Sequence, residues 1–261
     1  MGFDKPLDGD ERRETMNSFP VARLKQFKEE ITRFMMMYRF ALAELETKVE
    51  ILQEEFQLLH DYNPIEHTKS RLKSPESILG KIRRKGCVLS LPEIRSNIKD
   101  IAGLRITCSF IADIYRIRDM LLSQSDLTLI EEKDYIERPK GNGYRSLHLL
   151  VGVPVFMSDR EEQVCVEIQI RTIAMDFWAS LEHKIYYKYD ATVPNRLTEE
   201  LKEAAEAAFK LDKQMERLHE EISQIRSERE DDLSAQLGQL IGQSGPIQIP
   251  AEMLRLFSEN E

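Results

Sequence analysis

Three polar side chains, Glu167, Gln169 and Arg171, alternate with apolar ones over residues 164–171. A period of two is typical of a β-strand with one apolar and one polar face, so the three share the polar face. A strand that presents a carboxylate in this way could form one wall of an active site. A solvated strand face is the alternative, and the pattern alone leaves both interpretations open.

This strand is expected to continue directly into a helix. Thr172 is a suitable helix N-cap, and Phe177, Leu181 and Ile185 then recur at helical spacing. Trp178 lies one step round the helix and is expected in the core. A polar stripe on the same helix contains Asp176, Ser180, His183 and Tyr187.

The basic segment 69–86 is a second candidate for chemistry. Ser74 followed by Pro75 predicts a helix start, with the cap and the first-turn proline in their favoured positions. An anion larger than one phosphate, such as a triphosphate, could be surrounded by this helix start together with Arg71, Lys73, Ser77 and Lys81. A basic helix facing solvent is the alternative, and it is our interpretation of the run 83–85.

Asp100 stands at the start of a strand predicted from the alternation over residues 104–110. A carboxylate there can hold a metal ion or close a backbone turn, and taken alone the position favours the turn. A helix is predicted over 111–123 and a further strand over 128–136. This alternation of strands and helices predicts a mixed sheet with helices packed against it.

The run 139–143 (PKGNG) must be a loop, because proline and two glycines interrupt regular structure. Tyr144 follows directly, and a strand that carries His148 is predicted from about residue 146. An aromatic ring beside a loop with Lys140 is suited to stack on a base and hold its phosphates. A hairpin loop with a surface tyrosine is the alternative. The loop has no P-loop pattern.

Long helices are expected on both sides of this region. Over residues 21–60 apolar side chains recur every seven positions, as in one long helix or two consecutive ones. Residues 197–226 carry an apolar seam at alternating spacings of three and four, which needs a partner: the N-terminal helix or another subunit. Residues 1–20 are expected to be a flexible N-terminus. The tail 227–261 has no role that the sequence indicates.

The composition argues against a membrane-spanning protein and against a general nucleic-acid-binding protein. With 41% hydrophobic and 32% charged residues among 261, the chain is expected to be globular, soluble and cytoplasmic, without a membrane span. Its net charge of −9 argues against general affinity for DNA or RNA. Cys87, Cys108 and Cys165 lack the spacing of metal ligands and are expected to be buried free thiols.

Four motifs occur in a fixed order: SRLKSPESILGK, DIAGLRI, KGNGYRSLH and VEIQIRT with the following AMDFWASLEHKIYYK. Over about residues 21–226 they resemble the synthetase domain of the RelA/SpoT superfamily, and most of all its small alarmone synthetases, the last motif being closest to the RelP group. The resemblance implies an α/β (α+β), nucleotidyltransferase-like fold: a mixed β-sheet of about five strands flanked by helices, with long terminal helices. It also implies pyrophosphate transfer from ATP to the 3′-hydroxyl of GTP or GDP, which yields AMP and pppGpp or ppGpp.

The resemblance further implies a role for each candidate residue. Mg²⁺ would be bound by Asp100 and Glu167, and Glu167 would also activate the attacking hydroxyl. On the ATP side, Arg71 and Arg105 would clamp the adenine, and the phosphates would be held by Lys73, Ser77 and Lys81. Tyr144 would stack on the guanine of GTP, and Asp176 could accept from its N1–H and N2–H. The phosphates of that nucleotide would be met by Lys133, Lys140 and His148, and Asn142 and Gln169 would also bind it. Asp176 departs from the asparagine of several relatives.

The expected assembly is a homotetramer built from the terminal helices. Two alternatives remain beside the enzyme: a non-catalytic protein of the same fold that binds nucleotide or single-stranded RNA, and an oligomeric helical scaffold. The presence of both Asp100 and Glu167 argues against an inactive relative. RNA binding is not indicated by any motif.

Overall fold

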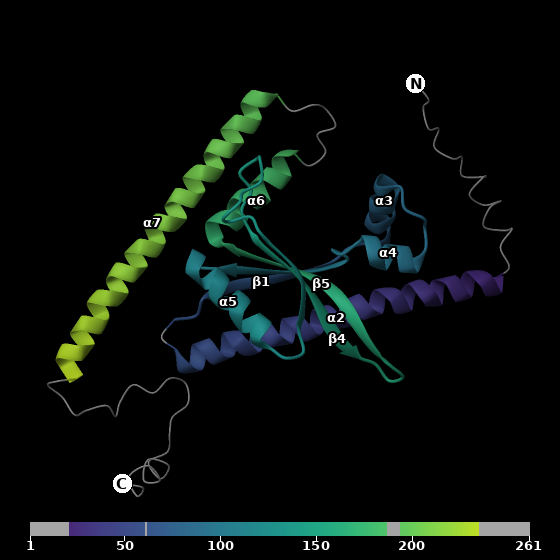
Figure 1. The fold of residues 1–261 in the computed structure, drawn as a ribbon, viewed down its shortest axis with the longest axis horizontal. Coiled ribbons are helices and arrows are strands. Elements are labelled where there is room, and N and C mark those ends of the chain that lie inside the picture. The colour runs from purple at the N-terminus through teal and green to yellow at the C-terminus, as the bar shows by residue number, and fades with distance from the viewer. Residues whose placement is uncertain (1–20, 61, 187–193, 235–261) are drawn as a thin grey trace, which may run out of the picture.

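The computed structural model describes residues 21–60, 62–186 and 194–234 (Figure 1). The predicted flexible N-terminus 1–20 lies outside these ranges, and so do Tyr187 and the tail from residue 235 onward. None of the helices in the described ranges is long and apolar enough to cross a bilayer.

A five-stranded mixed sheet forms the centre of the molecule and confirms the predicted fold class. The strands are β1 (Ile65–Leu72), β2 (Ala102–Cys108), β3 (Thr128–Asp134), β4 (Leu147–Phe156) and β5 (Glu161–Thr172). Their order across the sheet is β1-β2-β5-β4-β3. The β2–β5 pair is parallel and the other three pairs are antiparallel.

The described helices are α2 (Val21–Leu59), α3 (Pro75–Lys85), α4 (Leu91–Asn97), α5 (Ile111–Ser123), α6 (Ile173–Tyr186) and α7 (Asn195–Ser234). The N-terminal helical pattern forms one continuous helix, α2, which runs across the sheet, whereas α7 lies beside α5 and α6 (Figure 1). Ser74 caps α3 as predicted, because its side chain accepts a hydrogen bond from the Ser77 backbone N–H. α7 extends past residue 226, where the tail was predicted to begin.

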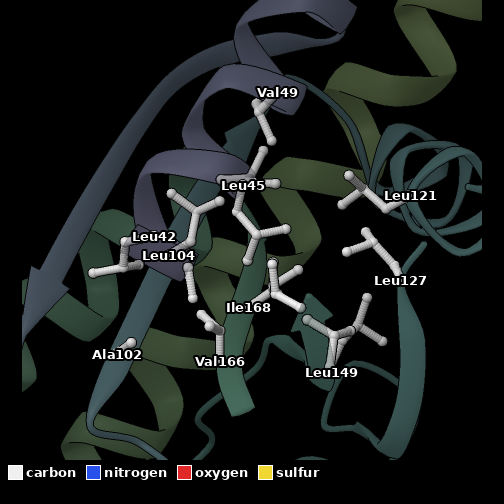
Figure 2. Close-up of a cluster of buried hydrophobic side chains, with 14 of the residues drawn as sticks. Leu42, Leu45, Val49, Ala102, Leu104, Leu121, Leu127, Leu149, Val166 and Ile168 are labelled. Atoms are coloured by element: carbon white, nitrogen blue, oxygen red, sulfur yellow. The ribbon is translucent and has the colours of Figure 1, made fainter. Parts of the chain in front are cut away.

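The core lies between α2 and the apolar face of the sheet. Leu45 of α2 is fully buried, and with Leu42 it lies over Leu104 of β2 and Ile168 of β5 (Figure 2). The predicted alternation of β5 is confirmed, since Val164, Val166, Ile168 and Ile170 are all buried. One sheet face is therefore closed by hydrophobic packing, and the opposite face is left to the polar side chains.

Strand β1 was not predicted. Only Ile65 of its eight residues is buried, because β1 is an edge strand that pairs with β2 alone. An exposed edge strand has no buried apolar face to produce an alternating pattern. The strand matters for the site, because it supplies Lys69 and Arg71.

The helical spacing in α6 predicted the helix correctly, but the apolar stripe used for the prediction is not the buried face. Phe177 and Ile185 are 65% and 63% exposed, whereas Met175 and Trp178 are buried. Thr172 caps the helix as predicted, accepting a hydrogen bond of 3.1 Å from the Met175 backbone N–H. The exposed stripe leaves an apolar surface on α6.

The apolar seam of α7 is also largely unburied. α7 packs through Leu201, which belongs to the predicted seam, and through Ala205 and Phe209, which lie next to seam positions, whereas Met215 and Ile222 of the seam are about half exposed. The three cysteines are free as expected, and Cys108 is buried, but Cys87 and Cys165 are only half-buried.

We expect Leu45→Ala to lower the free energy of unfolding by about 2–5 kcal/mol, because it opens a cavity where α2 meets the sheet. Leu59→Ala on the same helix is the matched control. Its side chain is 72% exposed, so the loss should stay below about 0.5 kcal/mol. Urea denaturation of the two variants measures the difference, and equal losses would contradict this packing.

Candidate active site

A row of polar side chains crosses the sheet on the face opposite α2. The strand register aligns Lys69 of β1, Arg105 of β2, Gln169 of β5, His148 of β4 and Lys133 of β3, one from each strand. Side chains aligned across neighbouring strands lie on the same face of a sheet. The register therefore gathers residues from five distant segments into one site.

The two predicted carboxylates lie beside this row. Glu167 is aligned with Gly103 of β2, and Gly103 is aligned with Arg71 of β1. Asp100 precedes β2 by two residues, at the end of the strand where Gly103 lies. The parallel β2–β5 pair thus brings the two acidic side chains to the same part of the polar face.

Two pockets meet at these carboxylates. The first, which we call the Arg71 pocket, has a volume of about 270 Å³ and is lined by Lys69, Arg71, Lys73, Gly103, Leu104, Arg105 and Gln169. The second, the His148 pocket, has a volume of about 240 Å³ and is lined by Lys81, Lys85, Asn97, Lys99, Glu131, Lys133, His148, Leu149 and Leu150. Asp100 and Glu167 line both pockets. A group that passes between the pockets would pass these two side chains.

Asp100 is held by two lysines. Lys73 Nζ and Lys81 Nζ lie 2.6 and 2.8 Å from its two carboxylate oxygens, one ammonium on each. Burial acts to raise the pKa of Asp100, but the hydrogen bonds from the two lysines outweigh burial, and the pKa is lowered. Asp100 is therefore ionised at neutral pH, and the turn suggested by sequence alone is not its main contact.

Glu167 is held on both of its oxygens. His148 Nδ1 lies 3.3 Å from Oε1, and Gln169 Nε2 donates to Oε2 at 2.8 Å. Burial and the negative charge of Asp100 act to raise the pKa of Glu167, but the hydrogen bonds from His148 and Gln169 outweigh them, and the pKa is lowered. The site thus keeps two carboxylates ionised at the border of two basic pockets.

A divalent cation suits this pair, although the chain does not supply a complete set of ligands. Within the described ranges, no group of three or more histidine, cysteine, aspartate or glutamate side chains converges as a metal site would require. Mg²⁺ commonly takes one or two carboxylates and completes its shell with water and substrate phosphates. Asp100 and Glu167, both ionised, fit that donor set.

Tyr144 lies three residues before β4 and lines neither pocket. Its hydroxyl is hydrogen-bonded to His148 Nε2 at 2.8 Å and accepts from Arg171. Its ring meets Tyr135 and His148 edge-on, and Trp178 lies beyond it at a centroid distance of 6.5 Å. The ring predicted to stack on a base is therefore fixed by its neighbours.

The loop 139–143 is tied to the helices behind it. Asn142 donates to Glu182 of α6 at 3.2 Å, and its own oxygen accepts from the Tyr144 backbone N–H. Gly143 has a φ of 88°, and a Cβ there would lie 2.6 Å from the Cβ of Ala205 in α7. Glycine is required for both reasons. We refer to this loop as the Gly143 loop.

Lys140 and Asp176 are engaged with protein groups rather than turned into a pocket. Lys140 Nζ lies 4.6 Å from the ring centroids of both Tyr135 and Tyr144. Asp176 Oδ1 lies 3.0 Å from Arg105 and 3.2 Å from Arg171. The Asp176 carboxylate thus joins two guanidinium groups.

The predicted site residues therefore fall into two groups. Those brought to the pockets are Arg71, Lys73, Lys81, Asp100, Arg105, Lys133, His148, Glu167 and Gln169. Those that line neither pocket are Ser77, paired with Ser74 in the first turn of α3, and Lys140, Asn142, Tyr144 and Asp176 around the Gly143 loop.

Sequence reasoning missed two kinds of residue. Lys85, expected to face solvent, and Lys99, given no role, both line the His148 pocket. Arg171 was placed on the polar strand face without a role, yet its side chain is 5% exposed and contacts several site residues. The alternation of β5 was the available signal for Arg171, since it groups this residue with Glu167.

Comparisons with known proteins show the family of the chain. Residues 70–192 match the family described as "Region found in RelA / SpoT proteins". The chain is 54% identical over 199 residues to the GTP pyrophosphokinase YwaC of Bacillus subtilis (strain 168), covering 76% of this chain and 95% of the relative.

Two similar solved structures are of small alarmone synthetase 1 from Bacillus subtilis. One is bound to its product pppGpp (TM-score 0.70, 41% identity, 75% of this chain and 99% of that one), and the other is bound to AMPCPP (TM-score 0.64, 38% identity, with the same coverage). Membership of the RelP group stays a prediction. With this identity over nearly the whole of a relative, the chain belongs to the RelA/SpoT superfamily and, within it, to the small alarmone synthetases.

Proposed function

We propose that this chain is a GTP pyrophosphokinase that transfers the pyrophosphate of ATP to the 3′-hydroxyl of GTP or GDP. The observation that carries the proposal is the position of Asp100 and Glu167 between two basic pockets, one for each nucleotide. The relatives named as GTP pyrophosphokinases, or found bound to pppGpp and AMPCPP, support the same substrates.

The Arg71 pocket is assigned to ATP. Arg71 and Arg105 come from neighbouring strands and can hold an adenine ring between planar guanidinium groups. Lys73 and Lys81 lie against Asp100, so triphosphate held by them would place its reacting phosphorus beside the carboxylates. Ser77, in the first turn of α3, is assigned to the same phosphates, since backbone N–H groups at a helix start favour anions.

The His148 pocket and the Gly143 loop are assigned to the acceptor nucleotide. Lys133 and His148 line the pocket, and Lys85 and Lys99 add positive charge for a 5′-polyphosphate. Stacking of guanine on Tyr144 would require the side chains that contact its ring, such as Lys140 and Tyr135, to move away. Lys140, Asn142, Gln169 and Asp176 are the polar groups available to the base and phosphates once they do.

The chain's own residues supply alignment and charge, which phosphoryl-type transfer chiefly needs. Asp100 and Glu167 would hold Mg²⁺, which when bound neutralises phosphate charge and lowers the pKa of the attacking hydroxyl. Glu167, ionised and next to the acceptor pocket, is placed to take the proton of the 3′-hydroxyl. The test is direct: purified protein with labelled ATP, GTP and Mg²⁺ should release AMP and pppGpp. Nucleotide binding without turnover would contradict the proposal.

Glu167→Gln should lower kcat about 10²- to 10⁴-fold, because it removes both the base and a metal ligand while keeping the side-chain shape. Chromatographic separation of labelled pppGpp measures the rate. Glu161→Gln, at the exposed first position of the same strand, is the control and should keep the wild-type rate. Full activity of Glu167→Gln would show that Glu167 is neither the base nor a required metal ligand.

Arg71→Ala should raise the Kd for AMPCPP roughly 2- to 30-fold, the factor expected for one guanidinium stacked on a ring. Isothermal titration calorimetry measures this without turnover. Arg118→Ala is the matched control, since Arg118 of α5 binds Asp119 and Glu132 and lines neither pocket. Unchanged affinity in Arg71→Ala would refute the adenine clamp.

The proposal includes a homotetramer formed through the terminal helices. The half-exposed apolar seam of α7 supports it, because five large side chains there lack burial in the single chain: Leu211, Met215, Leu218, Ile222 and Ile225.

Light scattering at micromolar concentration should give four times the monomer mass, and Met215→Glu with Ile222→Glu should dissociate the assembly. Lys210→Glu changes the net charge by the same two units at an exposed position of α7 and should leave the mass unchanged. A monomeric wild type would refute the tetramer.

A further inference from the structure

Arg171 is a buried guanidinium near the C-terminal end of β5. It donates hydrogen bonds to Tyr144 Oη, to Gln169 Oε1 at 2.8 Å, to Asp176 Oδ1 at 3.2 Å and to Ser146 Oγ at 3.3 Å. Arginine can only donate, so every group that it meets must present an acceptor. Because Gln169 and Tyr144 must accept from Arg171, their remaining hydrogens are available for Glu167 and His148.

The first arm of the network runs through Gln169. Because Gln169 Oε1 accepts from Arg171, the amide NH₂ is turned to Glu167 Oε2, 2.8 Å away. The reverse orientation would set the amide oxygen against the carboxylate and the NH₂ against the guanidinium, which is unfavourable at both ends. Arg171 therefore determines that Gln169 donates to Glu167.

The second arm runs through Tyr144 and His148. The Tyr144 oxygen accepts from Arg171, and His148 Nε2, 2.8 Å from the hydroxyl, is placed to accept its hydrogen. Burial raises the pKa of Tyr144, so the hydroxyl keeps the hydrogen that it donates. An Nε2 that accepts leaves the ring proton on Nδ1, which faces Glu167 Oε1 at 3.3 Å.

The two arms meet on the two oxygens of one carboxylate. We propose that Arg171 is the positioning residue of the site, fixing Glu167 through Gln169 on one oxygen and through Tyr144 and His148 on the other. The inference rests on the proposed function in that it gives Glu167 the catalytic task. It differs from the phosphate-binding role implied for His148, because here the imidazole supports the carboxylate.

A purely structural Arg171 would have other consequences. Its bond to Asp176 joins β5 to α6, and its bond to Ser146 joins β5 to the segment before β4, so its loss would lower stability even without any effect on Glu167. Two kinds of variant separate the roles. Tyr144→Phe removes only the hydroxyl of the second arm. Arg171→Lys keeps the charge but not the planar fork that reaches both arms.

The first experiment needs no activity. The ¹⁵N chemical shifts of His148, assigned by comparison with His148→Gln, distinguish an Nδ1–H from an Nε2–H tautomer. We expect a single Nδ1–H tautomer in the wild type and a mixture with Nε2–H in Tyr144→Phe and Arg171→Met. Arg145→Lys, which alters an arginine bound to Glu206 of α7, should keep the wild-type signal. An Nε2–H wild type, or no change in either variant, overturns the inference.

The second experiment measures steady-state kinetics with thermal unfolding. Arg171→Lys should lower kcat about 10- to 100-fold, as expected for a misplaced reacting group, while the KM for ATP stays within about twofold. If Arg171→Lys loses stability but keeps wild-type kcat below its unfolding range, the role is structural and the inference is wrong. If the wild-type protein forms no pppGpp, the proposed function is wrong. The tautomer of His148 would still show whether Arg171 fixes the hydrogen bonds to Glu167.

Discussion

The parallel pairing of β2 with β5 is the constraint on which the site depends. It aligns Gly103 with Glu167 and Arg105 with Gln169, and it brings Asp100 to the same end of the polar face. A slip of one residue would turn Glu167 towards α2 and Ile168 towards the pockets. The buried apolar faces of β2 and β5 resist that slip, since their side chains pack under α2 (Figure 2). Hydrophobic packing on one face thus specifies the chemistry on the other.

Much of this arrangement could be predicted, because the central strands have one buried apolar face and one polar face, and this produces an alternating sequence pattern. The alternation in β5 identified Glu167, Gln169 and Arg171 as one face, and the helix start at Ser74 followed from its cap and proline. Four ordered motifs then predicted the family, and nine of the predicted site residues line the two pockets. Each of these features depends on residues within one strand, one helical turn or one motif. Such short-range patterns can be recognised in the sequence without knowledge of the fold.

The rest depended on contacts between distant segments. β1 lacks a buried face, so nothing in its residues distinguished a strand from a loop. The buried sides of α6 and α7 are determined by which neighbour each helix meets, and apolar spacing alone did not identify the buried face of α6. The pairing of Asp176 with Arg105, and of Asn142 with Glu182, joins residues 71 and 40 positions apart. Such partners follow from the assembled fold and not from any one motif.

The close approach of Gly143 to Ala205 has an evolutionary consequence. Two positions separated by more than sixty places in the chain share a space too small for any additional carbon atom. A larger residue at either position would push α7 away from the Gly143 loop. Substitutions at these positions should therefore be rare or compensated by each other, and sequence divergence along α7 should be slowest on the side that carries Ala205.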